Sequence, residues 1–343
     1  MTLYRFLKCS QNSLPIKANC EMTNKPLNVL LLAGGVGGAK MAEGLQANSN
    51  IVLTILGNIG DDDSFHGLWV SPDIDTMIYT LSQEINRKQG WGVKEDDYKA
   101  LSFLSKLGAD TWMSLGDKDF GLHIYRTERL RRGDRASDIT KDIAKAFGIK
   151  ARIILPSDDI VQTKVLTDKG WLTFQEYFVK ERCDPEVKEI KFEGLEVAKP
   201  TYEALDAIST ADIILIAPSN PFVSISPILK IPGILEALKE TSVKKLAVSP
   251  LINGKAVKGP AEKIMTSLGM QADAIGIASF YGDLIDTIII DNVDSELSPK
   301  IRALGIEVFC TDILMSNSSE KKRLAEEILF LAKNNNLPEG AKR

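Results

Sequence analysis

Histidine, cysteine and long apolar runs are scarce in this 343-residue sequence. The chain holds only two histidines, and its four cysteines show no CxxC spacing. This excludes the common zinc motifs and a disulfide framework, so we expect reduced thiols in a cytoplasmic protein. No apolar run approaches the ~20 residues of a membrane-spanning helix. The formal net charge of −4 argues against nucleic acid as the main partner.

The first 27 residues differ from the rest of the chain. They carry three basic residues and no acid before Glu21, and they lack the apolar core of a secretory signal. We expect a disordered extension, either native or preceding a true start at Met22, with a weak organelle-targeting segment as the alternative. The pattern of a folded domain begins at Asn28 and ends near 333, and residues 334–343 form a tail.

Short apolar segments alternate with helix-like stretches along the chain. This alternation predicts an α/β fold, a Rossmann-like parallel sheet with helices on both faces. Residues 85–200, helix-like and then strand-rich, are expected to be an inserted segment or lid. A helix is predicted at 74–84, and an amphipathic helix at 320–336. The first two expected strands are 28–33 and 51–56, and units of a strand followed by a turn are expected at 212–221, 244–254, 272–283 and 306–314.

Glycines fill the turn after the first expected strand. Gly34, Gly35, Gly37 and Gly38 would let a bound anion approach the backbone and the N-terminus of the next helix. The spacing meets neither GxGxxG nor a Walker loop. The alternative is a tight structural turn.

Aspartates cluster after the second expected strand. Asp61, Asp62 and Asp63 follow it directly, and Asp73 and Asp75 precede the next helix. Carboxylates at the carboxyl edge of a sheet suit Mg²⁺, and one of them could act as a general base for a hydroxyl group. Aspartate is also common in turns and at helix N-termini, so an N-cap is the alternative for Asp73 or Asp75. We expect Asp63 to be solvated.

Polar turns follow the later strands. Ser219, Asn220 and Pro221 end the third strand and could bind a nucleotide base or phosphate, although the same residues are good turn formers. Residues 249–254 follow the fourth strand in the same way.

Basic residues are few near these loops. Lys40 follows the glycines, while Lys118 and Arg126 lie in a charged, helix-like stretch that is expected to be a mostly solvated face. His66 and His123 fit no catalytic triad order, and we expect both to be structural.

Taken in order, these motifs resemble the CofD family, the 2-phospho-L-lactate transferases whose bacterial members are phosphoenolpyruvyl transferases. The resemblance runs from about residue 28 to 331 and is carried by GGVGGAKMAEGL, NIGDDDSFHGLWVSPDIDTMIYTL, WGVKEDD, LGDKDFGLHIYRTERLRRG, PSDDIVQTKV, FQEYFV, APSNPFVSISPIL and SPLINGKAVKGPAEKIM.

The resemblance implies a Mg²⁺-dependent step in the biosynthesis of coenzyme F-420. A phospho-lactyl or phospho-enolpyruvyl group would pass from a guanosine diphosphate carrier to the ribityl hydroxyl of the deazaflavin Fo, releasing GMP. The glycines and residues 219–221 match the nucleotide side. The resemblance places Asp61 on the metal, with Asp62 beside it, and Asp75 next to Fo as a second catalytic residue. The family also suggests a homodimer.

Ser114 and Lys118 depart from the family pattern. Lys118 replaces the usual arginine of GDRD, and Ser114 stands where many archaeal relatives have a basic residue. Lysine keeps the charge but loses the bidentate fork. Ser114 is expected near Fo, and Lys118 and Arg126 are candidates for phosphate binding.

Two other functions remain open from the sequence. A non-enzymatic relative could bind a nucleotide or nucleotide sugar in regulation, but it would not need the PDID motif. A dinucleotide-dependent oxidoreductase is disfavoured because GxGxxG is absent. The sequence does not distinguish a lactate, enolpyruvate or glycerate donor, nor does it show whether the host makes coenzyme F-420.

Overall fold

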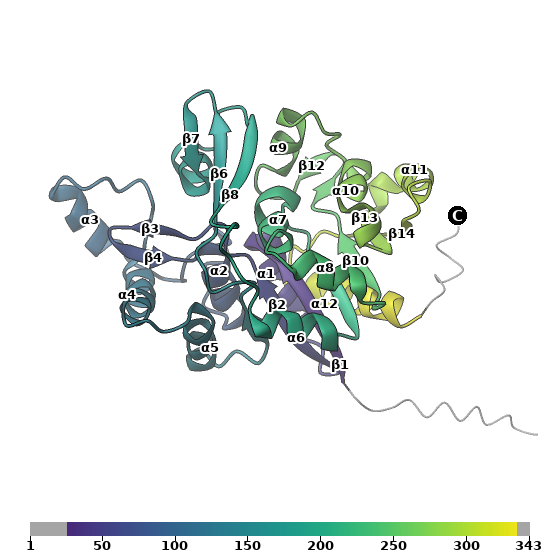
Figure 1. Cartoon of the computed structure of the whole chain (residues 1–343), viewed down its shortest axis with the longest axis horizontal. Helices are drawn as coiled ribbons and strands as arrows, with labels where there is room; N and C mark the ends of the chain where they lie inside the picture. The colour runs from purple at the N-terminus through teal and green to yellow at the C-terminus, as the bar shows by residue number, and fades with distance from the viewer. Residues whose placement is uncertain (1–25, 335–343) are drawn as a thin grey trace, which may run out of the picture.

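Seven parallel strands form the central sheet of the computed structural model, which describes residues 26–334 (Figure 1). The strand order across the sheet is β14-β13-β10-β9-β1-β2-β5. Counted along the chain, this is the doubly wound order 3-2-1-4-5-6 with one more strand at the edge. The predicted Rossmann-like α/β fold is therefore confirmed. The strands are β1 (Leu27–Ala33), β2 (Ile51–Gly57), β5 (Arg152–Ile154), β9 (Ile213–Ile216), β10 (Lys245–Val248), β13 (Thr287–Asp291) and β14 (Glu307–Thr311).

The strand β1 lies at the centre because its apolar side chains can be buried on both faces of the sheet. It pairs in parallel with β2 on one side and β9 on the other, so that Leu31 faces both Ile55 and Leu215. All three side chains are fully buried. The chain reverses its winding direction between β1 and β9, and a crevice therefore opens at their carboxyl ends.

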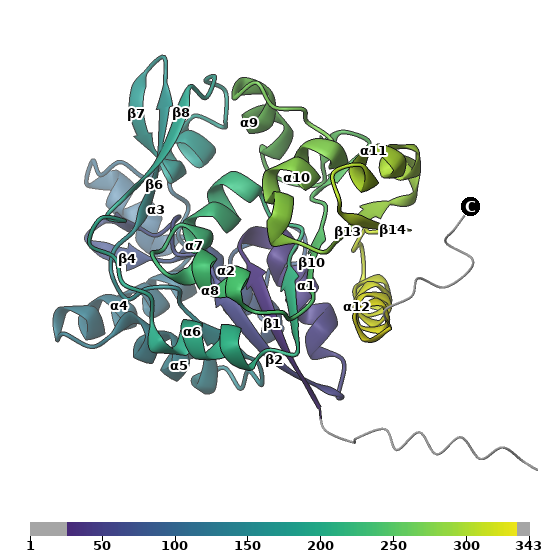
Figure 2. The same ribbon diagram turned by 45° about the vertical axis from the view of Figure 1, so that its right-hand side comes forward.

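Helices cover both faces of the sheet. On one face α1 (Gly35–Gln46) packs against α2 (Pro72–Leu81) and α12 (Ser318–Lys333). On the other, α6 (Tyr202–Thr210) contacts β1 and α8 (Ile234–Glu240) (Figures 1 and 2). The remaining helical elements of the later half are the π-helical turn η2 (Pro221–Ile225), the α-helices α7 (Ser226–Leu229), α9 (Ala261–Ser267), α10 (Ala274–Tyr281) and α11 (Ser298–Arg302), and the 3₁₀ helices η3 (Gly282–Leu284) and η4 (Asn292–Leu297).

One expected strand of the central sheet is wrong, and one strand of this sheet was missed. Residues 274–281 within the expected strand 272–283 form α10, because Asp273 caps the helix by accepting the N–H groups of Ile275 and Gly276. The actual strand is β13, a run of five buried residues that follows directly. The run AIGIASFY is apolar throughout, so its periodicity could not separate a buried helix from a buried strand.

The expected insertion at 85–200 is interrupted by the central sheet. Within this range β5 pairs with β2, and α5 (Ala136–Ala146) packs against β5. A three-stranded antiparallel sheet rises above the central sheet in Figure 1. The run 170–179 belongs to the stretch expected to be strand-rich, but only its first part is a strand, and a π-helical turn follows. Besides β5 and α5, the range 85–200 contains α3 (Lys99–Lys106), α4 (Asp117–Arg131), β6 (Gln162–Thr167), β7 (Gly170–Thr173), η1 (Glu176–Lys180) and β8 (Glu189–Glu193).

Two hairpins complete the edge of the sheet at which the strands end. The hairpin β3 (Asp63–Phe65) and β4 (Leu68–Val70) follows β2, and the hairpin β11 (Leu251–Ile252) and β12 (Lys255–Ala256) follows β10. The expected extension 1–27 lies outside the described residues up to residue 25, and the tail does so from 335 onward.

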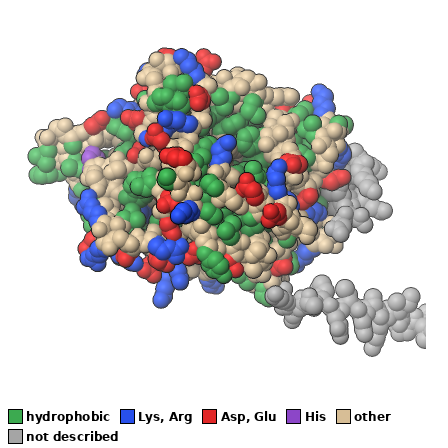
Figure 3. Space-filling model, in the orientation of Figure 1, with side chains coloured by type: hydrophobic (Ala, Val, Ile, Leu, Met, Phe, Trp, Pro, Cys, Tyr) green, Lys and Arg blue, Asp and Glu red, His purple; other side chains and the backbone are tan. Residues whose placement is uncertain are grey.

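The surface mixes acidic and basic side chains, and apolar side chains gather at the end of the molecule that carries α3 (Figure 3). Phe103 of α3 and Leu107 just after it are both more than half exposed. Within residues 26–334 no single helix has the length and apolar character to cross a bilayer. One pair of helical segments, Pro221–Leu229 and Ile234–Glu240, is long and apolar enough when the two are taken together, but the pair is bent by 82°.

Replacing Gly44 with alanine should destabilise the fold by about 1–3 kcal/mol, because overpacking displaces neighbouring backbone. A Cβ at this position would lie 2.3 Å from the Lys321 carbonyl oxygen, where α1 meets α12. Chemical denaturation measures the change. Gly121→Ala in α4 is the matched control, since its Cβ would meet nothing within 4 Å, and it should be neutral or stabilising by up to about 1 kcal/mol. Equal stability of the two variants would contradict the close contact.

Candidate active site

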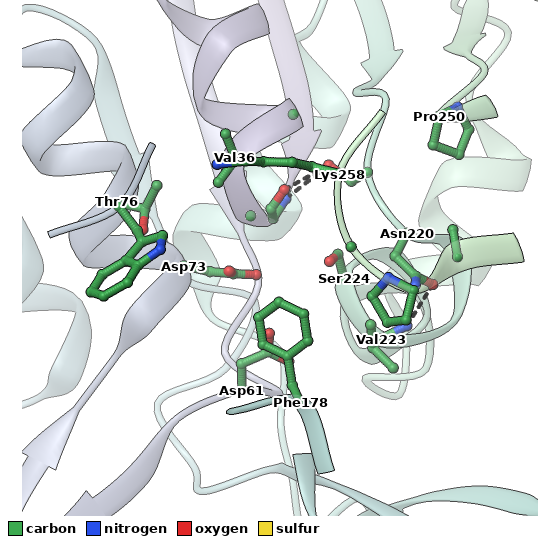
Figure 4. Close-up of a pocket in the computed structure, with 18 of the residues that line it drawn as sticks. Val36, Asp61, Asp73, Thr76, Phe178, Asn220, Val223, Ser224, Pro250 and Lys258 are labelled. Carbon is green, nitrogen blue, oxygen red and sulfur yellow. Dashed lines mark hydrogen bonds between the residues drawn. The ribbon is translucent and has the colours of Figure 1, made fainter. Parts of the chain in front are cut away.

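A pocket of about 550 Å³ lies at the carboxyl edge of the central sheet (Figure 4). Segments that follow five strands line it: 34–37 after β1, Asp61 after β2, 218–220 after β9, 249–250 after β10 and 313–315 after β14. Parallel strands direct their carboxyl ends to one edge, so segments far apart in the sequence meet here.

The glycine turn is fastened to the segment after β9. The Gly34 N–H lies 3.3 Å from Ser219 Oγ, which in turn donates to the Gly34 carbonyl at 2.7 Å. A Cβ on Gly37 would lie 2.1 Å from the Pro218 carbonyl oxygen. Gly34, Gly35 and Gly37 line the pocket, whereas Gly38 does not, because it packs α1 against the end of β1.

Asn220 presents a free donor to the pocket. Its Oδ1 accepts the N–H groups of Phe222 and Val223 and so caps η2 (Figure 4). Its buried Nδ2 has no hydrogen-bond partner among the described residues. Pro221 begins η2 and does not line the pocket. Ser219 and Asn220 thus reach the pocket, and Pro221 sets the direction of the chain behind them.

Asp61 and Asp73 bring two buried carboxylates to the pocket. Asn58 Nδ2 donates to Asp73 Oδ2 at 2.8 Å, while Asp61 Oδ1 has no hydrogen-bond partner among the described residues. Burial, and then the charge of Asp73, raise the pKa of Asp61 well above its usual range. Burial raises the pKa of Asp73 to about 6. The two carboxylates therefore share a site that favours a bound proton or a cation.

Asp62 and Asp63 point elsewhere. Asp62 Oδ2 accepts Ser71 Oγ at 2.7 Å and Trp69 Nε1 at 3.2 Å, on the side of a second cavity of about 410 Å³. Asp63 lies in β3 and is partly exposed. Of the two aspartates predicted to bind metal, the structure places Asp61 in the pocket and Asp62 outside it.

Asp75 forms a buried ion pair behind the pocket. Both terminal nitrogens of Arg126 donate to its carboxylate, and His123 Nδ1 lies 3.7 Å away. Neither Asp75 nor Arg126 lines the pocket. Residues two apart on a helix point in nearly opposite directions, so Asp73 of α2 faces the pocket and Asp75 cannot. Of the two aspartates for which the sequence left an N-cap open, the structure therefore places Asp73 in the pocket and Asp75, predicted to lie beside the acceptor, behind it.

Of the other residues predicted to bind a ligand, some line the pocket and some do not. Ser114 lines the pocket, but Lys118 does not, and its Nζ donates to the Lys94 carbonyl at 2.8 Å. Arg126 is committed to Asp75 rather than to a phosphate. Burial lowers the pKa of His123 to about 4, which supports its structural interpretation.

Sequence reasoning missed an aromatic wall. Trp91, Phe174 and Phe178 line the pocket, and the two phenylalanine rings stack with centroids 5.5 Å apart. The aromatic residues of the run FQEYFV were visible in the sequence. Because the run was expected to be a strand, however, the sequence did not show that Phe174 and Phe178 lie on the same face. Lys258 was also missed, and it lines the pocket together with Lys40.

Asp62→Asn should flatten the dependence of stability on pH. Burial raises the pKa of Asp62 to about 8 from its usual 3.8, so between these values the folded protein holds a proton that the unfolded chain has released. Stability should therefore fall as pH rises through this window, by up to about 1.4 kcal/mol per pH unit for one proton. Denaturation at pH 5, 7 and 9 measures it. Identical slopes in Asp62→Asn and wild type would contradict the assignment.

Arg126→Met should destabilise the protein by about 3–5 kcal/mol, because it leaves the buried Asp75 carboxylate unpaired. Asp75→Asn should also lower stability. Arg132→Met is the control, since Arg132 pairs with Glu128 at the surface, where such a pair contributes about 0.3–0.5 kcal/mol. Thermal melting measures all three. An Asp75→Asn variant with wild-type stability but no catalysis would restore the catalytic role predicted from the sequence.

Comparison with known proteins identifies the family. The family model described as 2-phospho-L-lactate transferase CofD matches residues 29–326. The 2-phospho-L-lactate transferase of Methanocaldococcus jannaschii is 39% identical over 88% of this chain and 97% of its own length. The phosphoenolpyruvate transferase of Streptomyces griseus is 37% identical over 89% and 98%.

A solved structure supports the fold at greater distance. A UPF0052-family protein from Bacillus halodurans superposes with a TM-score of 0.58 at 18% identity, covering 89% of this chain and 99% of its own. The family model spans nearly all of the described residues, including the glycine turn and both pocket carboxylates. The chain therefore belongs to the CofD family of 2-phospho-L-lactate transferases.

Proposed function

We propose that the protein transfers a phospho-lactyl or phospho-enolpyruvyl group from a guanosine diphosphate carrier to a hydroxyl of Fo, releasing GMP, as a step in coenzyme F-420 biosynthesis. The observation that carries the proposal is one pocket in which a glycine turn, two buried carboxylates and an aromatic wall meet. The names of the relatives, 2-phospho-L-lactate transferase and phosphoenolpyruvate transferase, support the reaction type.

The nucleotide would bind over the glycine turn. Gly34, Gly35 and Gly37 line the pocket at the N-terminus of α1, and backbone N–H groups at a helix N-terminus favour a phosphate. The free Nδ2 of Asn220 would donate to the base or a phosphate. Both features lie at the ends of β1 and β9, which is where a doubly wound sheet binds nucleotides.

The acceptor would bind against the aromatic wall. A planar deazaflavin ring can stack on Phe174, Phe178 or Trp91, and aromatic stacking of this kind favours offset or edge contacts. Ser114 lines the same pocket and could bind a polar edge of the ring or its ribityl chain. The hydroxyl to be phosphorylated would then face Asp61 and Asp73.

The transfer forms one bond and breaks one. The acceptor oxygen bonds to the transferred phosphorus, the bond from that phosphorus to the nucleotide phosphate breaks, and its electron pair leaves with GMP. The hydroxyl proton needs an acceptor, and Asp73 is suited to this role because its pKa of about 6 lies near neutral pH. Asn58 holds the Asp73 carboxylate in place.

The carboxylate of Asp61, beside Asp73, fits a magnesium ion. Asp61 Oδ1 is buried without a hydrogen-bond partner, and its raised pKa reflects burial and the neighbouring charge of Asp73. Residues 26–334 contain no group of three or more candidate ligand side chains, so substrate oxygens and water would complete the coordination. When bound, Mg²⁺ would supply charge neutralisation for the phosphates.

The direct test is to incubate the protein with Fo, a guanosine diphosphate-linked donor and Mg²⁺. A product whose mass equals that of Fo plus the phospho-acid group, together with GMP, supports the proposal. Lactate and enolpyruvate donors, compared at equal concentration, identify the preferred group. Tight binding of the donor without any product would favour a non-enzymatic nucleotide-binding role instead.

Asp73→Asn should reduce transfer by about a hundredfold to a thousandfold, equivalent to about 3–4 kcal/mol. Asp61→Asn should cause a similar loss and raise the Mg²⁺ concentration needed for half-maximal rate. Turnover of Fo measured against Mg²⁺ concentration separates the two effects. Asp63→Asn, outside the pocket, is the control and should remain close to wild type. Normal turnover of Asp73→Asn would show that another group accepts the proton.

A further inference from the structure

The pocket contains two lysines that no step of the proposed function uses. Of the residues that line it, four have ionisable side chains, namely Lys40, Lys258, Asp61 and Asp73. In Figure 4, Lys258 extends toward Val36 in the upper part of the view, and Asp73 and Asp61 lie below them. The function proposed above uses the two carboxylates and leaves the two lysines without a role.

Lys40 is a cation without a carboxylate partner among the described residues. It lies on α1 three residues after Gly37, so it is next to the glycine turn and half-buried. Burial, then the charges of Lys321 and Lys258, lower the pKa of Lys40. Glu43, on the same helix, is held instead by Lys321 at 2.7 Å and by Arg87 at 2.8 Å.

Lys258 reaches the pocket from the opposite wall. It lies between β12 and α9, and its Nζ donates to the carbonyl of Gln89, which belongs to the loop that also carries Trp91. Among residues 26–334 it forms no ion pair, so a neutral carbonyl is its partner. An ammonium group has three donors, and this contact uses one of them.

We propose that Lys40 and Lys258 together form the binding site for the phosphate that leaves with the nucleotide, and that Lys258 makes the pocket select nucleotides by charge. This rests on the function proposed above. The leaving phosphate gains negative charge as its bond to the transferred phosphorus breaks, so cations beside it stabilise the transition state more than the bound donor. The carboxylates of Asp61 and Asp73 repel the same phosphate and so favour the orientation that places the acceptor beside them.

The simpler alternative is that Lys258 only ties two loops together through Gln89. In that case its loss would weaken every ligand of the pocket equally, because the wall that carries Trp91 would move. A charge-specific role predicts a loss that grows with the number of phosphates.

The experiment measures the affinity of guanosine, GMP, GDP and inorganic pyrophosphate by calorimetry for wild type, Lys258→Met and Lys258→Arg. Methionine keeps the apolar stem and removes the charge. Lys258→Met should bind GDP about tenfold to a hundredfold more weakly and guanosine unchanged, and Lys258→Arg should recover most of the loss. GDP binding by Lys258→Met should also depend less on salt. Lys40→Met should show the same selective loss.

Lys255→Met is the matched control. Lys255 lies three residues earlier on the same hairpin, is exposed and does not line the pocket, so its loss should change no affinity. Equal weakening of guanosine and GDP in Lys258→Met, or unchanged GDP affinity, would overturn the proposal.

The outcome for pyrophosphate separates this proposal from the proposed function. Lysine-dependent binding of pyrophosphate without any binding of guanine nucleotides would leave the phosphate site standing and overturn the guanosine donor. Normal, lysine-dependent GDP binding without transfer to Fo would overturn the transfer reaction alone. If wild type binds neither GDP nor pyrophosphate, the phosphate site itself is overturned.

Discussion

The contact between the ends of β1 and β9 is the constraint on which the site depends. Gly37 has no Cβ because the Pro218 carbonyl occupies that space, and Ser219 exchanges hydrogen bonds with Gly34 across the same gap. A larger residue at either glycine would push the two turns apart. The glycines are therefore needed first for backbone packing, and this packing brings the N-terminus of α1 to the pocket.

Once these turns are joined, the position of the carboxylates follows. A Cβ on Gly34 would lie 2.5 Å from Asp73 Oδ2, so this glycine also makes room for the acid of α2. Asn58, at the end of β2, fixes the other side of the same carboxylate. Behind α2, the pair of Asp75 with Arg126 holds the helix against α4. One helix thus uses one aspartate for the pocket and another for its own anchorage.

The sequence predicted the Rossmann-like sheet and the edge where the site lies, because continuous apolar strands and glycine-rich turns leave a strong local pattern. It could not assign Asp73 and Asp75, since both precede the same helix and only the rotation of α2 decides which one faces the pocket. The strand β13 was missed because the preceding α10 is equally apolar. Trp91 and Lys258 were missed because they join the site from loops far apart in the sequence.

Burial explains why so acidic a pocket is compatible with a stable fold. Burial and the charge of Asp73 raise the pKa of Asp61, so the folded protein disfavours two adjacent buried negative charges at this place. Binding a cation would stabilise the charged form of these carboxylates, and binding a phosphate would bring negative charge to Lys40 and Lys258. The cation and the phosphate would therefore each neutralise buried charge that destabilises the ligand-free protein. A ligand that brings both should stabilise the folded protein.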